Sequence, residues 1–129
     1  MKKLAPILLI AIFLFSTGCT AFSDKKAQQI SKQYIDDLLQ GNYEKLFTSY
    51  DLSDNMSEST PQIMETGHQY IQSTCGRITK VSYLNTTFDK VNKIYACEYA
   101  LIGEKGEIKI ILDFSNNGKV DNLYISEMK

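Results

Sequence analysis

The chain lacks several of the signals that mark common catalytic and binding sites. It has no tryptophan, one histidine, three cysteines and two prolines in 129 residues. One histidine and widely separated cysteines do not give a zinc-ligand spacing, and there is no Gly-rich phosphate loop and no basic patch with interleaved aromatics. The charges nearly balance, with 14 Lys+Arg against 15 Asp+Glu. We therefore expect no metal, no cofactor and no nucleic-acid partner.

A long apolar run is also missing, and the one pronounced run lies at the start of the chain. It covers Leu4–Phe15, follows Lys2 and Lys3, and leads into Ser16-Thr17-Gly18-Cys19. A membrane-spanning helix needs about 18–20 apolar residues. A positive start, a short apolar run and a small-residue junction are instead typical of a secretory signal peptide.

The Gly18-Cys19 junction resembles the lipobox of bacterial lipoproteins, although Ser16 stands where an aliphatic residue is usual. The resemblance implies that residues 1–18 are removed and that Cys19 is the lipid attachment site, carrying a diacylglycerol. Two acyl chains are enough for stable membrane attachment. We expect a lipid-anchored, extracytoplasmic protein of the cell membrane or outer membrane; ordinary secretion with cleavage nearby is the alternative.

After a short tether, residues 19–23, an apolar period of 3.6 residues predicts helices. The first begins at the N-cap Ser23 and ends near Gly41. A shorter helix is expected over Tyr43–Ser49, before a polar surface loop over Asp51–Ser59. The third helix begins at Thr60-Pro61 and stops at Gly76. Its expected inner stripe consists of Ile63, Gly67, Tyr70, Ile71 and Thr74.

From Arg77 the apolar period changes to about two residues, which predicts strands. The expected strands are Ile78–Phe88, Lys93–Ile102, Glu107–Phe114 and Lys119–Glu127. Tight turns between them predict an antiparallel meander with one apolar face that needs a cover. Residues 24–129 are thus expected to form one α+β domain, with three helices packed on one face of a curved four-stranded antiparallel sheet. The expected core is Ile30, Tyr34, Leu38, Phe47, Ile71, Tyr95, Tyr99, Ile110, Leu112 and Leu123.

This order of elements is similar to the nuclear transport factor 2-like fold, and to the uncharacterised DUF3887-type domains of bacterial lipoproteins. The matching stretches are Leu39–Glu44, Pro61–Gly76 and Phe114–Val120. The resemblance implies a cone-shaped cavity between sheet and helices but no shared chemistry. Tyrosine combines apolar area with a polar tip, and the candidate cavity-lining residues are Tyr34, Tyr70, Tyr83, Tyr95 and Tyr99.

Enzymes of this fold use an Asp, Glu, His or Tyr that faces the cavity. His68 is the only histidine, and we interpret it mainly as a helix-surface residue. Glu98 alternates with the apolar residues of its strand and is expected to point away from the core. Cys75 and Cys97 are expected to remain unbonded, because the predicted register places them too far apart for a disulfide.

The sequence favours a membrane-tethered binding or accessory module that holds a small ligand, a peptide or a protein partner. No catalytic residue is assigned. One alternative is a small cavity enzyme with isomerase- or dehydratase-like acid-base chemistry. Another is a homodimerisation module that uses an apolar patch on the outward sheet face, made by Ala96, Ala100, Ile102 and Ile111.

Overall fold

The computed structural model describes residues 21–128. The predicted signal peptide, residues 1–18, and the predicted lipid attachment site, Cys19, lie outside the described residues. The helices are α2 (Asp24–Leu39), α3 (Lys45–Thr48), α4 (Asp54–Ser57) and α5 (Pro61–Cys75). The strands are β1 (Ile78–Asp89), β2 (Ile94–Gly103), β3 (Glu107–Ser115) and β4 (Val120–Glu127).

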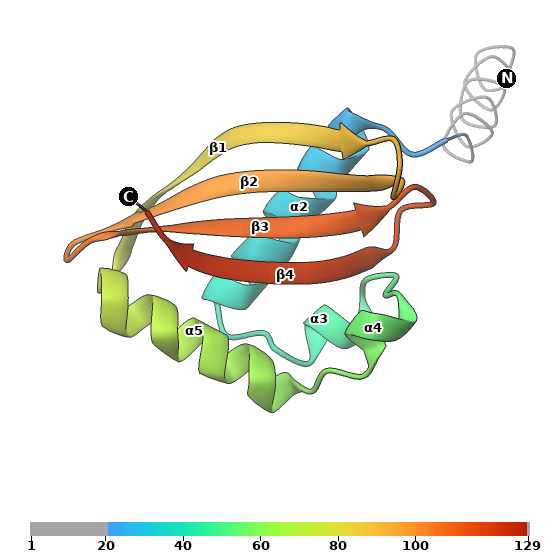
Figure 1. The fold of residues 1–129 in the computed structure, drawn as a ribbon. Coiled ribbons are helices and arrows are strands. Elements are labelled where there is room, and N and C mark those ends of the chain that lie inside the picture. The colour runs from blue at the N-terminus through green and yellow to red at the C-terminus, as the bar shows by residue number, and fades with distance from the viewer. Residues whose placement is uncertain (1–20, 129) are drawn as a thin grey trace, which may run out of the picture.

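The fold is α+β, with helices followed by an open antiparallel sheet of strand order β1-β2-β3-β4 (Figure 1). Helix α2 lies against β1 and β2, α5 lies against β2 and β3, and α4 lies against β4. The expectation of three helices was wrong, because the described residues contain four. The additional helix, α4, is a single turn inside the segment expected to be a loop, and the Ser53 hydroxyl caps it by accepting from the Met56 N–H.

Local signals explain the boundaries of the two long helices. Ser23 caps α2 through its side chain, which accepts from the Lys26 N–H. Thr60 caps α5 in the same way, and Pro61 follows at the first turn, where a missing N–H costs no hydrogen bond. Gly76 ends α5 with a φ of 69°, a conformation that favours glycine.

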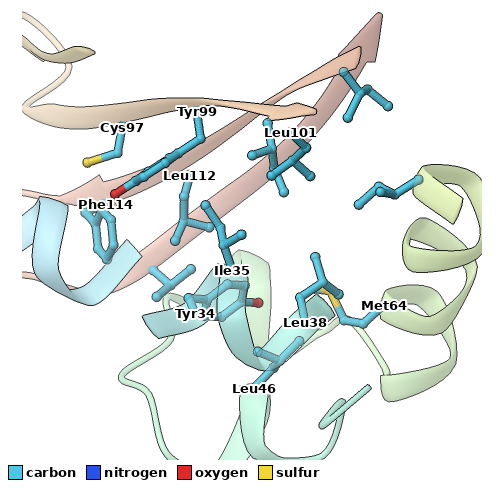
Figure 2. Packing of buried hydrophobic residues seen from close by; sticks show 14 of the residues in the cluster. Tyr34, Ile35, Leu38, Leu46, Met64, Cys97, Tyr99, Leu101, Leu112 and Phe114 are labelled. Carbon is cyan, nitrogen blue, oxygen red and sulfur yellow. The ribbon is translucent and has the colours of Figure 1, made fainter. Parts of the chain in front are cut away.

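The core lies between the helices and one face of the sheet. Figure 2 shows Tyr34, Ile35 and Leu38 near Tyr99, Leu101 and Leu112, with Met64 close by. Six of the ten expected core residues are fully or almost fully buried: Tyr34, Leu38, Ile71, Tyr99, Ile110 and Leu112. The other four pack against this core and are partly buried: Ile30, Phe47, Tyr95 and Leu123.

The inner face of α5 differs from the expected stripe. The helix buries Met64, His68, Ile71 and Cys75, whereas Ile63 and Tyr70 are 57% and 42% exposed. The expectation for Ile63 and Tyr70 was therefore wrong, as was the interpretation of His68 as a surface residue. The true face has the same three- and four-residue spacing, shifted by one position.

Both cysteines of the described region are buried and free, as expected. Cys97 pairs in register with Thr86, and its sulfur lies 3.5 Å from the Thr86 hydroxyl. Cys75 lies beside Leu101 instead, with its sulfur 4.0 Å from that carbonyl oxygen. Cys97 and Leu101 are four positions apart on β2, a span of about 13 Å along the strand, so the two cysteines lie too far apart for a disulfide.

The segment before α2 packs against the end of the sheet where the β1–β2 and β3–β4 turns lie. The Phe22 ring lies 5.2 Å from the Tyr95 ring and 5.4 Å from the Phe114 ring, between centroids. The Tyr95 hydroxyl donates to the Phe22 carbonyl oxygen at 3.3 Å. Phe88 extends the cluster, since its ring lies 4.5 Å from that of Tyr95. We call these four residues the aromatic end of the domain.

Candidate functional site

The opposite end of the domain is hollowed by a cleft of about 620 Å³, which we call the His68 cleft. It forms where the last turns of α5 lead into the first residues of β1, beside the C-terminal end of α2. Its lining consists of Leu39, His68, Gln72, Gly76, Arg77, Ile78, Thr79, Lys80 and Val81. This volume lies within the range of about 300–1,000 Å³ usual for small-molecule sites.

The β2–β3 hairpin fixes this end of α5. The Lys105 N–H donates to the Cys75 carbonyl oxygen at 2.7 Å, and the Glu104 N–H donates to that of Arg77 at 3.1 Å. Gly103 makes the approach possible, because a Cβ there would meet the Cys75 carbonyl oxygen at 2.2 Å. The wall of the His68 cleft is thus held by backbone contacts rather than by side chains alone.

A second cleft, of about 950 Å³, lies between the α2–α3 connection and the N-terminal turns of α5; we call it the Tyr43 cleft. The two linings have no residue in common: the Tyr43 cleft is lined by Gly41, Asn42, Tyr43, Glu44, Lys45, Thr60, Pro61, Gln62 and Glu65. A hydrogen bond connects the two clefts, because the Tyr43 hydroxyl of one lining lies 2.7 Å from His68 Nδ1 of the other. The two rings meet edge to face, 5.8 Å apart.

Both members of the Tyr43–His68 pair favour their neutral forms. Burial lowers the pKa of His68, and burial followed by the negative charge of Glu65 raises the pKa of Tyr43. With the Tyr43 hydroxyl donating to Nδ1, the imidazole carries its proton on Nε2. Within residues 21–128 no hydrogen bond engages Nε2, so it can serve as a donor to a ligand.

A buried carboxylate, that of Asp37, occurs elsewhere, on the side of α2 that faces α3. The Tyr50 hydroxyl donates to Asp37 Oδ2 at 2.7 Å, and Lys45 Nζ lies 3.5 Å from Oδ1. Burial opposes ionisation of Asp37, but the Tyr50 hydrogen bond and the Lys45 charge outweigh it and lower the pKa of Asp37. Burial and the contact with Asp37 raise the pKa of Tyr50. The proton stays on Tyr50, so the pair ties α3 to α2 and is poorly suited to proton transfer.

The five tyrosines proposed as cavity-lining residues line neither the His68 cleft nor the Tyr43 cleft. Tyr34 and Tyr99 are buried in the core, and Tyr95 belongs to the aromatic end. Tyr70 and Tyr83 are 42% and 40% exposed. The resemblance implied a cone-shaped cavity between sheet and helices; the hollow between α5 and β4 measures only about 180 Å³, which is small for a ligand site.

The outward sheet face carries Glu98, as expected, and its carboxylate lies 3.2 Å from Lys109 Nζ on β3. Of the four residues expected to form an apolar patch there, Ala96, Ile102 and Ile111 are partly exposed. Ala100 is 4% exposed. In this part of the chain the outward sheet face carries both charged and apolar side chains, and homodimerisation stays a prediction.

Sequence reasoning passed over the two residues that join the clefts. Tyr43 belongs to the Gly-Asn-Tyr step that carried the fold resemblance, and it received no role. His68 was interpreted as a surface residue because it lies next to the expected inner stripe, although its spacing from Met64, Ile71 and Cys75 is that of one helix face. That spacing was the available signal.

Comparisons with known proteins return no family model, no curated protein and no solved structure that matches this chain. Among the described residues, no three His, Cys, Asp or Glu side chains gather as a metal site. Over the same residues, no helix has the length and apolarity to cross a membrane.

Proposed function

We propose that the protein is a membrane-tethered, extracytoplasmic lipoprotein whose nuclear transport factor 2-like domain binds a small ligand in the His68 cleft. The observation that carries the binding proposal is the lining of this cleft, which combines apolar side chains with cationic ones. Leu39, Ile78 and Val81 supply apolar surface, Arg77 and Lys80 supply positive charge, and the lining contains no carboxylate.

The lining indicates the chemistry of the ligand. An apolar wall with a few convergent polar groups is typical of small-molecule sites. Arg77 already pairs with Glu104 at 2.6 Å, which leaves Lys80 and the Nε2 of His68 as groups for an anionic or hydrogen-bond-accepting moiety. We propose a small molecule with an apolar body and one carboxylate or similar anionic group.

The anchoring proposal rests on the sequence, and the fold is compatible with it. The lipobox-like junction ends at Cys19, and Phe22 is held at the aromatic end. The His68 cleft borders the start of β1, and the aromatic end includes Phe88 near its finish. The eleven steps from Ile78 to Asp89 span about 36 Å, so the His68 cleft and Phe22 lie at opposite ends of the sheet. The order of helices and strands supports the family proposal.

The anchor is tested by replacing Cys19 with Ala in the full chain. Wild type should incorporate labelled palmitate and sediment with membranes, whereas Cys19→Ala should lose the label and be released or left unprocessed. Normal processing and membrane retention of Cys19→Ala would contradict the anchor.

Ligand binding is tested by native mass spectrometry of the full lipoprotein released from membranes in mild detergent. Val81→Trp should fill the cleft and remove any bound small molecule. Ser82→Trp is the matched control, because Ser82 pairs with Ala100 on the outward sheet face. An adduct that survives Val81→Trp, or is lost equally from both variants, would contradict binding in this cleft.

A further inference from the structure

The turn between β1 and β2 projects beyond the aromatic end and exposes an apolar side chain. Val91 is 88% exposed, the most exposed of the large hydrophobic residues in the described region. It stands between Lys90 and Lys93, which are also exposed. Val91 therefore leaves most of its side chain in contact with the surroundings of the domain, with a lysine on either side of it in the turn.

The shape of this turn is fixed by its own hydrogen bonds. Asp89 Oδ1 accepts from the Val91 N–H at 2.9 Å and from the Asn92 N–H at 3.2 Å, and Oδ2 accepts from the Asn92 side chain at 2.8 Å. Lys93 adopts a φ of 56°, an uncommon value for a residue other than glycine. The turn therefore presents Val91 from a defined loop, and the Asp89 carboxylate is occupied within it.

The position of Phe22 places the anchor close to this turn. Phe22 lies three positions after Cys19 in the sequence, a reach of at most about 10 Å. Phe22 contacts Tyr95, and Tyr95 pairs in register with Phe88, next to the turn. The β3–β4 turn lies at the same end, because a Cβ on Gly118 would meet the Phe22 ring at 2.9 Å. Figure 1 shows both turns on the side where the chain enters α2.

Three exposed lysines lie in the two turns at this end. Lys119 follows Gly118 in the second turn and is exposed. The ion pairs of residues 21–128 are Lys45–Asp37, Arg77–Glu104 and Lys109–Glu98. Lys90, Lys93 and Lys119 take part in none of them, and the acidic residues of the neighbouring segments are Asp24, Asp51, Asp89, Asp113 and Asp121. Lysines that flank an apolar side chain are typical of segments at a lipid headgroup boundary.

We infer that the β1–β2 turn rests on the lipid bilayer, with Val91 among the headgroups and Lys90 and Lys93 on anionic phospholipids. The inference rests on the proposed acylation of Cys19. It adds a second contact with the membrane, which sets the orientation of the domain and turns the His68 cleft away from the bilayer. Together, Lys90 and Lys93 should shift the equilibrium between the turn resting on an anionic bilayer and the turn held away from it by about 30-fold.

The test uses the full lipoprotein, purified from membranes and reconstituted in vesicles of phosphatidylethanolamine and phosphatidylglycerol. A fluorescent label is placed through Val91→Cys, and through Gln69→Cys on α5 as the comparison position. Cys75 and Cys97 are buried, so the new thiol should label selectively. Headgroup-quencher lipids should quench the label at position 91 and leave the one at position 69 unaffected.

Charge reversal sharpens the test. Lys90→Glu/Lys93→Glu should remove most of the quenching at position 91, whereas the control Lys32→Glu/Lys105→Glu should leave it unchanged. If the protein is acylated and the labels at positions 91 and 69 are quenched equally, the contact of the β1–β2 turn with the bilayer is contradicted, whereas the anchor is not. Mass spectrometry of the same preparation reports acylation of Cys19, and its absence would overturn the anchor together with this inference.

Discussion

The aromatic end and the cleft end of the domain are built from the same helix layer and the same strands, but they are filled differently. At the aromatic end, Phe22, Tyr95 and Phe114 close the space between the tether and the sheet with ring contacts. At the cleft end, Gly103 lets the backbone of β2 approach that of Cys75, Gly76 ends α5, and a hollow remains beside His68. Large side chains close a sheet end, whereas glycines at a close backbone approach leave room for a site.

The two ends also differ in the side chains that they present to their surroundings. The end nearest the predicted anchor is packed and presents lysines and one apolar side chain, while the far end offers a cleft with cationic and apolar lining. A central core common to both ends, which includes Leu112, holds them at a fixed distance. Substitutions should therefore affect one end, the other, or both, according to where they lie.

Leu112→Ala should affect both ends and have the largest effect. Leu112 is fully buried, and truncating such a leucine lowers the free energy of unfolding by about 2–5 kcal/mol. Denaturant unfolding measures the loss. The control is Ile111→Ala, one residue along β3 on the outward face, which should cost clearly less. A Leu112→Ala variant as stable as wild type would contradict the assigned face of β3.

Gly103→Ala should damage the cleft end. Its Cβ would meet the Cys75 carbonyl oxygen at 2.2 Å, and overpacking of this kind costs about 1–3 kcal/mol. Hydrogen exchange should rise most in the last turn of α5. Gly106→Ala is the matched control in the same hairpin, because its Cβ would lie 3.2 Å from the Thr74 carbonyl oxygen. Equal effects of the two variants would argue against this close approach.

Gly118→Ala should loosen the aromatic end instead. Gly118 has a φ of 90°, which costs about 1 kcal/mol for alanine, and the new methyl would meet the Phe22 ring. Aromatic NMR signals of Phe22 and Tyr95 should shift while those of His68 stay in place. Shifts of His68 as large as those of Phe22 would show that the two ends are not independent.

Tyr43→Phe should remove the hydrogen bond to His68 at a cost of about 1 kcal/mol. Because the chain has one histidine, its imidazole signals can be followed without assignment ambiguity. They should shift in Tyr43→Phe and remain unchanged in Tyr70→Phe, where the hydroxyl lies on the exposed face of α5. An unchanged imidazole in Tyr43→Phe would contradict the contact.

The smallest expected effect is a pH dependence from His68. Burial lowers its pKa in the folded protein, so below about pH 6.5 the unfolded chain takes up the proton first. The free energy of unfolding should fall as the pH drops from 6.5 toward the lowered pKa of folded His68, and should not depend on this group above pH 7. The His68→Asn variant should lose that dependence. A folded-state titration midpoint above 6.5 would contradict the assignment.

The sheet was predicted closely, because its signals are local. Alternating side chains and the turn glycines of residues 103–118 placed each strand end within a residue of its observed position. The single turn α4 escaped prediction, since four residues are too few to show a period. The face of α5 was wrong because two of its large apolar residues, Ile63 and Tyr70, lie outside the core while His68 lies inside.

The clefts were beyond the reach of sequence reasoning for a physical reason. The His68 cleft exists because Leu39, His68 and Val81 converge from three elements, and because a glycine on β2 lets a hairpin approach α5. Neither convergence nor a close backbone approach leaves a periodic signal. The aromatic end was hidden similarly, since Phe22 finds its partners in distant strands.

The hydrogen bond between Tyr95 and the Phe22 carbonyl spans 73 positions of the chain, and this sets an order of assembly. Each strand pairs with its neighbour in sequence, so the hairpins can form one after another as the chain is synthesised. Phe22 is made first, yet its docking surface is complete only when the β3–β4 turn has been made. Phe22 can therefore dock only after the last hairpin has formed, so the first residues of the domain to be made are among the last to reach their final contacts.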